Sequence, residues 1–293
     1  MSPYRQGFPR VVAGLIGLTA LTMGPGSTRA LASPHAGIAF AEREPTDSPT
    51  VRLTLEQLKA KLSTAGAEGP DLSKVNLSGL DLSGIDFKRA NLTGAWFSNS
   101  KLVGANLFTC DLTDANLSGA DLSKANLDAT VLRRANLQKA NLQGASLFST
   151  IIESADLSGA NLSGTRIIGY LRGAKLPSAN LRNSNAGADP GNQSMGVMRA
   201  SFVSADLSGA DLTGANLFKA DFSHATLAKA RLTNANLSNA ELVQTDLTGA
   251  DLTGAKLAKA NLDGADFTGA TGLSQAQGLA EARNRDKAII DAK

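Results

Sequence analysis

The chain has 293 residues, of which 19% are charged and only 4% are aromatic. So few aromatic residues argue against a conventional globular core built around large apolar side chains. The 29 glycines are typical of a repetitive fold, and the single cysteine excludes a disulfide within the chain.

Residues 1–32 have the composition of a secretory signal peptide. This segment contains three arginines and no acidic residue. Its apolar stretch, Val11 to Met23, is too short to span a membrane of about 30 Å. Ala30-Leu31-Ala32 has the small residues that suit cleavage after Ala32. An ordinary buried helix is the alternative, but no amphipathic sequence follows. We therefore expect export to the periplasm or medium, with no membrane span after cleavage.

Removal of this segment would change the charge balance. The whole chain carries 29 Lys and Arg against 26 Asp and Glu, and three of the arginines lie within residues 1–32. The remaining chain would hold 26 basic and 26 acidic residues. A formally neutral protein gives no electrostatic reason to expect a nucleic-acid partner.

A linker and a helix follow the signal peptide. Residues 33–53 are small, polar and proline-containing, as linkers often are. Thr54 and Gln57 have the spacing of a capping box. The leucines after them share one helical face: Leu55, Leu58 and Leu62. We expect a helix over residues 54–66 that covers the first coil of the repeats.

From Asp71 onward the sequence repeats every five residues. Each of 36 pentads has Leu, Phe or Ile at its centre, and Ala stands two positions earlier in 26 of them. A five-residue step would carry these residues around every side of a helix, and it would alternate them between the two faces of a strand. Neither element can bury them all, so the chain must bend once per pentad.

The residues after each central position favour such a bend. They are commonly Ser or Thr followed by Gly, as in Leu77-Ser78-Gly79, and glycine tolerates positive φ. Four right-angle bends close a square, and the next coil stacks on it at about 4.8 Å. The repeats therefore predict a stack of about nine coils.

Repeats such as Ala115-Asn116-Leu117-Ser118-Gly119 and Ala205-Asp206-Leu207-Ser208-Gly209 resemble the A-(D/N)-L-x-x motif of the pentapeptide-repeat family. The resemblance implies an all-β fold, a right-handed quadrilateral β-helix, here with short helical caps. Periodicity alone predicts the closed square but not its hand.

The repeat is interrupted once, over residues 182–199. Ile167 and Phe202 are 35 residues apart, which is seven whole pentads, so a deletion is balanced by a later insertion. We expect coils over 70–181 and 200–270 in one continuous stack, with the irregular segment as a loop. The alternative is a hinge between two stacks.

Residues 271–293 follow the last repeat. Ser274 could begin a second helix that covers the last coil, or the segment could remain a tail. The resemblance also allows a homodimer through this end, since C-terminal faces serve that role in some family members.

A square coil places residues 20 positions apart in one column along the stack. Two adjoining columns then bring five apolar residues to one outer corner: Phe108, Val131, Phe148, Ile151 and Ile168. Trp96 is a further outward aromatic residue on the next face. Because Ser, Thr, Asn and Asp are usual at these positions, the apolar strip indicates a contact surface. Either a partner or the chain's own irregular or N-terminal segment would cover it.

Asp or Asn stands before most central residues. These side chains could form a cation-binding ladder. The pattern favours the simpler interpretation, in which they hydrogen-bond to nearby backbone and to like residues in adjacent coils.

We expect no catalytic, cofactor or metal site. His35 lies in the linker, His224 lies at a turn position, and Cys110 takes an alanine position that should be buried. The sequence therefore predicts a non-enzymatic, exported solenoid that presents a binding surface to a protein or cell-envelope partner. The alternative is a gyrase-binding DNA mimic, as the quinolone-resistance members of the family are. Those members are cytoplasmic and strongly acidic, unlike this chain.

Overall fold

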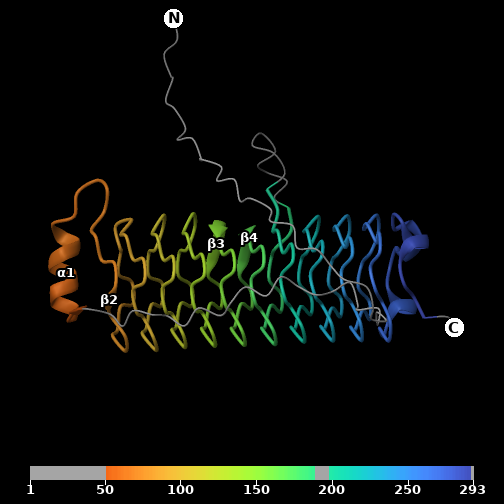
Figure 1. Ribbon diagram of the computed structural model, residues 1–293, viewed down its shortest axis with the longest axis horizontal. Helices are drawn as coiled ribbons and strands as arrows, with labels where there is room; N and C mark the ends of the chain where they lie inside the picture. The colour runs from red at the N-terminus through yellow and green to blue at the C-terminus, as the bar shows by residue number, and fades with distance from the viewer. Residues whose placement is uncertain (1–50, 189–197, 292–293) are drawn as a thin grey trace, which may run out of the picture. The chain divides into compact units, whose positions relative to one another are not determined.

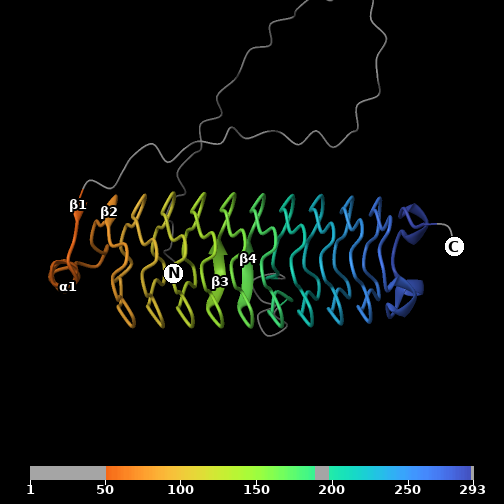
Figure 2. The same ribbon diagram turned by 90° about the horizontal axis from the view of Figure 1, so that it is seen from below.

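The computed structural model describes residues 51–188 and 198–291, which all lie in one compact unit, Pro45–Lys293. Within this unit, coils stack side by side from helix α1 (Leu55–Ser63) at one end to the C-terminal coil at the other (Figure 1). A view turned by 90° shows the same succession of coils (Figure 2). Parallel bridges join residues 20 positions apart, such as Asn116 to Asn136.

Backbone hydrogen bonds hold each coil to both of its neighbours. The Leu137 N–H donates to the Asp156 carbonyl at 2.7 Å, and the Asn136 N–H donates to the Ala115 carbonyl at 2.9 Å. Within the coil, the Ala140 N–H donates to the Leu137 carbonyl at 3.0 Å and closes the corner. This pattern recurs along the stack and pairs most main-chain groups of the coils without long strands.

The described strands are short and form two parallel two-stranded sheets rather than one closed sheet. Strand β1 (Val51–Arg52) pairs with β2 (Val75–Asn76), and β3 (Ser146–Ile151) pairs with β4 (Arg166–Tyr170). Elsewhere in the described ranges, neighbouring coils meet through single bridges.

The central residues of the pentads fill the shaft of the stack. Each one between Leu72 and Leu181 and between Phe202 and Phe267 is at most 1% exposed. The rings of Phe202 and Phe222 stack at 4.7 Å. Where Thr replaces Ala in the crowded corner, its hydroxyl donates a hydrogen bond to a backbone carbonyl. Thr130 Oγ1, for example, donates to the Leu107 carbonyl oxygen at 2.8 Å. The pentad period therefore separates inside from outside along the described coils.

Each corner residue takes a left-handed backbone conformation. Glycine adopts it readily, as at Gly79 with φ of 73°. Other residues also occupy this position, such as Lys124 with φ of 58° and Asn183 with φ of 54°. For non-glycine residues this conformation costs about 1–2 kcal/mol, which explains why Gly is the most frequent residue there.

The N-terminal end is covered by α1, which begins with a capping box. Thr54 Oγ1 accepts a hydrogen bond from the Gln57 N–H at 3.2 Å, and Gln57 Oε1 accepts one from the Thr54 N–H at 2.9 Å. Leu58 and Leu62 are buried against the core. The expected linker over 33–53 ends too late, because β1 already pairs with the first coil and precedes the buried Leu53.

The stack continues across the irregular segment. Tyr170 bridges to Ser201, and Asn185 bridges both to Arg166 and to Asn216. Residues 182–188 therefore belong to a coil and not to the loop expected over 182–199. Residues 189–197 lie outside the described residues.

The C-terminal cap differs from the expected helix. Residues 271–291 form a wider coil with three 3₁₀ turns: η2 (Leu273–Gln275), η3 (Leu279–Glu281) and η4 (Arg285–Lys287). Each turn follows a residue with left-handed φ, which interrupts any α-helix: Gly272, Gly278 and Asn284. Bridges at Thr271, Gln277, Arg283 and Ile289 show that the repeat lengthens to six residues. Ile289 is 55% exposed at this end, and dimerisation there stays a prediction.

Candidate functional site

Four apolar side chains gather at one corner of neighbouring coils. Val131 bridges to Ile151, and Ile151 pairs in turn with Tyr170, so the three follow one column along the stack. Phe148 lies in the adjoining column on β3. Tyr170 is 58% exposed, and the other three are half-buried. Val131, Phe148, Ile151 and Tyr170 are called the apolar corner below.

Tyr170 was not among the residues expected from the sequence. The deletion after Ile167 shortens one step along the chain to four residues, which moves Tyr170 into the column of Val131 and Ile151. Column positions counted in steps of 20 therefore miss it by one. The lost residue between Ile167 and Leu171 is the signal that could have revealed it.

The same deletion makes the prediction for Ile168 wrong. Its side chain is only 2% exposed, whereas an outward position was expected. With one residue missing, β4 crosses the corner as an extended strand and its middle residues are drawn inward. Gly169 shows how tightly the chain passes, because a Cβ there would collide with the Thr150 carbonyl oxygen.

Two other expected residues lie apart from this corner. Phe108, 46% exposed, lines a separate hollow of about 260 Å³ beside Lys88 and Arg89. Asp128 stands between it and Phe148, and the Asp128 carboxylate accepts the Phe148 N–H at 2.9 Å. Trp96 bridges to residues of another face and is half-buried.

The charges around the apolar corner are mostly paired. The Arg166 guanidinium lies over the Phe148 ring at 4.3 Å from its centroid. On the adjoining face, Arg133 pairs with Glu153 at 3.1 Å. The corner is thus an apolar surface with a polar rim, a composition typical of protein interfaces.

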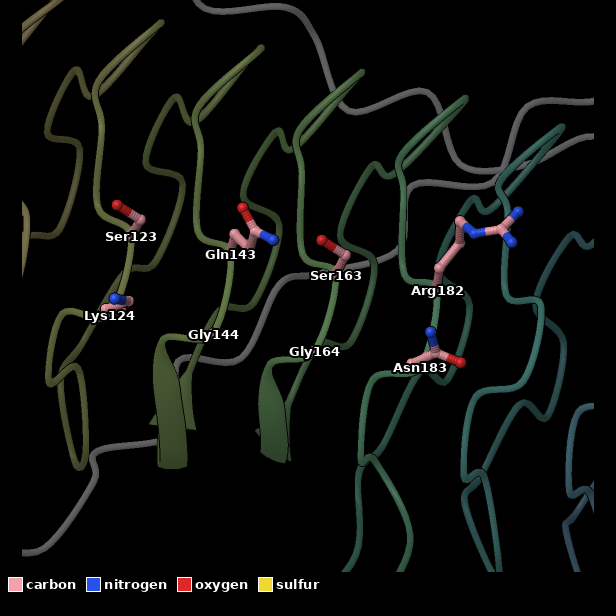
Figure 3. A pocket seen from close by; sticks show the side chains of 8 residues that line it. All are labelled: Ser123, Lys124, Gln143, Gly144, Ser163, Gly164, Arg182 and Asn183. Carbon is pink, nitrogen blue, oxygen red and sulfur yellow. The ribbon is translucent and has the colours of Figure 1, made fainter.

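A second open surface lies on another face of the stack (Figure 3). This hollow of about 640 Å³, called the trough below, takes two residues from each of four successive coils. They are Ser123 and Lys124, Gln143 and Gly144, Ser163 and Gly164, and Arg182 and Asn183. The glycines leave an open floor, and no atom lies within 4 Å of a Cβ placed on Gly164.

The Asp and Asn side chains beside the trough form the hydrogen-bonded ladder that the sequence favoured. Asn141 Nδ2 donates to Asp121 Oδ1 at 2.9 Å, and Asn161 Nδ2 donates to Asn141 Oδ1 at 3.0 Å. Each member also accepts a backbone N–H two residues later, as Asn141 does from Gln143 at 3.2 Å. In residues 51–188 and 198–291, no group of three His, Cys, Asp or Glu could hold a metal ion.

Cys110 is buried at an alanine position in the shaft. Burial raises the pKa of its thiol to about 12, so the thiolate is scarcely formed at neutral pH. Within the described part of the chain, no helix is long and apolar enough to cross a membrane.

A family model described as pentapeptide repeats matches the chain in eight copies, over residues 71–107, 110–147, 126–167, 198–234 and 230–269. The chain belongs to the pentapeptide-repeat family. A pentapeptide-repeat protein has a right-handed β-helix fold, and members of the family are generally structural or interaction proteins rather than enzymes.

Several solved pentapeptide-repeat structures are similar to this chain. HetL from the cyanobacterium Nostoc, involved in heterocyst differentiation regulation, is 28% identical over 81% of this chain and 100% of its own, with a TM-score of 0.35. A protein of the Arabidopsis thaliana thylakoid lumen is 26% identical over 62% of this chain and 68% of its own, with a TM-score of 0.20.

QnrB1, a plasmid-mediated fluoroquinolone resistance protein, is 20% identical over 67% of this chain and 85% of its own, with a TM-score of 0.22. The repeat match over residues 71–269 shows the family. No curated protein sequence matches the chain significantly.

Proposed function

We propose that this protein is an exported, non-enzymatic solenoid of about nine square coils that binds a protein partner through the apolar corner. Export rests on the signal-like composition of residues 1–32, and the coil number rests on the 36 pentads. Family membership supports an interaction role.

The apolar corner is the observation that carries the proposal. In the column of Val131, Ile151 and Tyr170, the coils on either side present Asp111 and Ser201. An apolar run within an otherwise polar column lowers the solubility of the protein. These outward side chains do not pack in the shaft, so they add nothing to its stability. Burial of Phe148 and Tyr170 against a partner would remove that cost at about 25 cal/mol for each Å² covered. Aromatic side chains of this kind are the usual anchors of protein interfaces.

A crosslinking experiment tests this contact. A photoreactive phenylalanine analogue at position 170 should capture one partner in the compartment where the protein resides. Phe148→Ser should abolish the capture, because it removes the neighbouring anchor without touching the shaft. Phe218→Ser is the matched control, since Phe218 occupies the same place in a pentad beyond the insertion. A crosslink back to the chain itself would instead show that the corner is covered internally.

Mass spectrometry of the mature N-terminus tests export separately. Cleavage after Ala32 is the expected result. An intact Met1 in the cytoplasm would contradict export and favour the gyrase-binding alternative, which a supercoiling-inhibition assay would then test. The near balance of 29 basic and 26 acidic residues gives this alternative little support, since the acidic members of the family carry a strong negative charge.

A further inference from the structure

The trough has hydrogen-bonding groups that nothing within the described chain uses. The side chains of Ser123, Gln143 and Ser163 make no hydrogen bond to any residue of 51–188 or 198–291. The three follow one another on successive coils in a single row (Figure 3). The equivalent glutamine of the neighbouring corner is paired, since Gln138 Nε2 donates to Asp156 Oδ2 at 2.7 Å. The trough therefore offers an open line of donors and acceptors.

The two ends of the trough are positively charged. Lys124 lies at one end and Arg182 at the other, three coils apart, a separation of about 14 Å at the usual strand spacing. No acidic residue lines the trough. Arg182 Nη1 pairs with Asp211 at 3.0 Å, which uses only part of the donor capacity of the guanidinium. The charge of the trough thus favours an anionic ligand that is long enough to reach both ends.

The glycine N–H groups beneath the trough are already used within the stack. The Gly144 N–H donates to the Ser163 carbonyl at 3.0 Å, and the Gly164 N–H donates to the Arg182 carbonyl at 2.9 Å. A peptide strand could therefore not add to the stack through main-chain hydrogen bonds. The lining contains no aromatic or large aliphatic side chain, so it offers neither an anchor for a peptide nor a stacking platform for nucleic-acid bases.

We propose that the trough binds an acidic polysaccharide that runs along the stack. Carboxylates spaced along the chain of sugars would meet Lys124 and Arg182. Sugar hydroxyls would bond to Ser123, Gln143 and Ser163 between them. Gly144 and Gly164 would let the sugar rings approach the floor. The trough and the apolar corner lie on different faces, so this inference stands or falls independently of the protein contact.

Calorimetric titration of the full-length protein with an oligogalacturonate tests the proposal. Binding is expected, with an affinity that falls as salt rises. Lys124→Gln and Arg182→Gln should each weaken it about tenfold, the usual worth of a charge-assisted hydrogen bond. Gln143→Glu should weaken binding more than either of these substitutions, because the new carboxylate in the middle of the trough would repel an acidic ligand. Urea unfolding of each variant should match that of the natural chain, since all three residues are exposed.

Lys139→Gln is the matched control. Lys139 has the same left-handed corner conformation as Lys124, with φ of 57°, but lies at the neighbouring corner. The Lys139→Gln substitution should therefore leave the affinity for oligogalacturonate unchanged. Equal weakening by Lys139→Gln would overturn the proposal, as would absence of oligogalacturonate binding or equally tight binding of a neutral dextran. Tighter binding of polyglutamate or single-stranded DNA at the same site would assign the trough to another class of polymer and overturn it too.

Discussion

Two neighbouring corners of the stack are built from nearly the same pentads but expose different chemistry. The trough contains Ser123, Gln143 and Ser163, and the next corner has Ser118, Gln138 and Ser158 at the equivalent places. The second corner, called the closed corner below, satisfies its polar groups, because Gln138 and Ser158 both bond to the Asp156 carboxylate. The side chains of Ser123, Gln143 and Ser163 in the trough make no hydrogen bond to the part of the chain that the structure describes.

One residue type accounts for the difference. The place of Asp156 is taken beside the trough by Asn161, which lies 18 residues after Gln143, just as Asp156 lies 18 residues after Gln138. Asn161 is already engaged in the ladder, since it donates to Asn141 and accepts from Asn180, both at 3.0 Å. Whether an outward side chain is hydrogen-bonded thus depends on the residue that the next coil places beside it, and not on its own pentad.

Both corners rest on the same buried shaft. Leu137 lies under the closed corner and Leu142 under the trough, and both are 0% exposed. Leu137→Asp and Leu142→Asp should each cost more than about 4 kcal/mol, because each buries a charge without a partner. Urea unfolding measures the loss. If either variant were as stable as the natural chain, the two leucines would not both be buried in one shaft.

The glycines of the two corners should respond differently to alanine. Gly164, in the trough, has φ of 64° and open space around a Cβ, so Gly164→Ala should cost about 1 kcal/mol of backbone strain. Gly119, at the closed corner, has the same strain, and its Cβ would also meet the Asn99 side chain. Gly119→Ala should therefore cost slightly more than Gly164→Ala, because the flexible end of the Asn99 side chain must also turn away. If thermal unfolding showed equal losses of stability for Gly164→Ala and Gly119→Ala, the trough floor would be no more open than the closed corner.

Truncation of the two glutamines gives a smaller contrast. Gln138→Ala removes the hydrogen bond to Asp156 and should cost about 1 kcal/mol, whereas Gln143→Ala removes no bond within the described chain and should cost almost nothing. In a double-mutant cycle with Asp156→Asn, only Gln138 should show coupling. Coupling at Gln143 would mean that the trough is already satisfied internally.

The smallest expected effect is a dependence on acid. Burial tends to raise the pKa of Asp156, but hydrogen bonds from Ser158 and Gln138 outweigh it and hold the pKa below its ordinary value of 3.8. The stability that this carboxylate contributes is therefore present above about pH 4 and is lost as the pH falls through the lower folded value. Asp156→Asn should reduce the acid sensitivity of the melting temperature. An identical pH profile in the variant would contradict this assignment.

Periodicity was a sound guide to the interior because a pentad decides locally which residue points inward. The Leu, Phe or Ile centres, the Ala two positions before each centre and the left-handed corner residue all lie within five residues of one another. The capping box of Thr54 and Gln57 is likewise a local pattern. Features of this kind need no knowledge of how the chain folds over long distances.

The sequence by itself determined the repeat, the buried shaft and the cap on the first coil. Only the tertiary structure decided which outward residues share a surface. It brought Tyr170 into the apolar corner, buried Ile168 and turned the expected C-terminal helix into a coil of six-residue steps. It also gave Gln138 a side-chain partner, whereas the Gln143 side chain has none among the described residues. The physical reason is that the neighbours of a surface side chain come from adjacent coils. A single deleted residue therefore changes which side chains meet across the coils, until the spacing of 20 residues returns at Ser201.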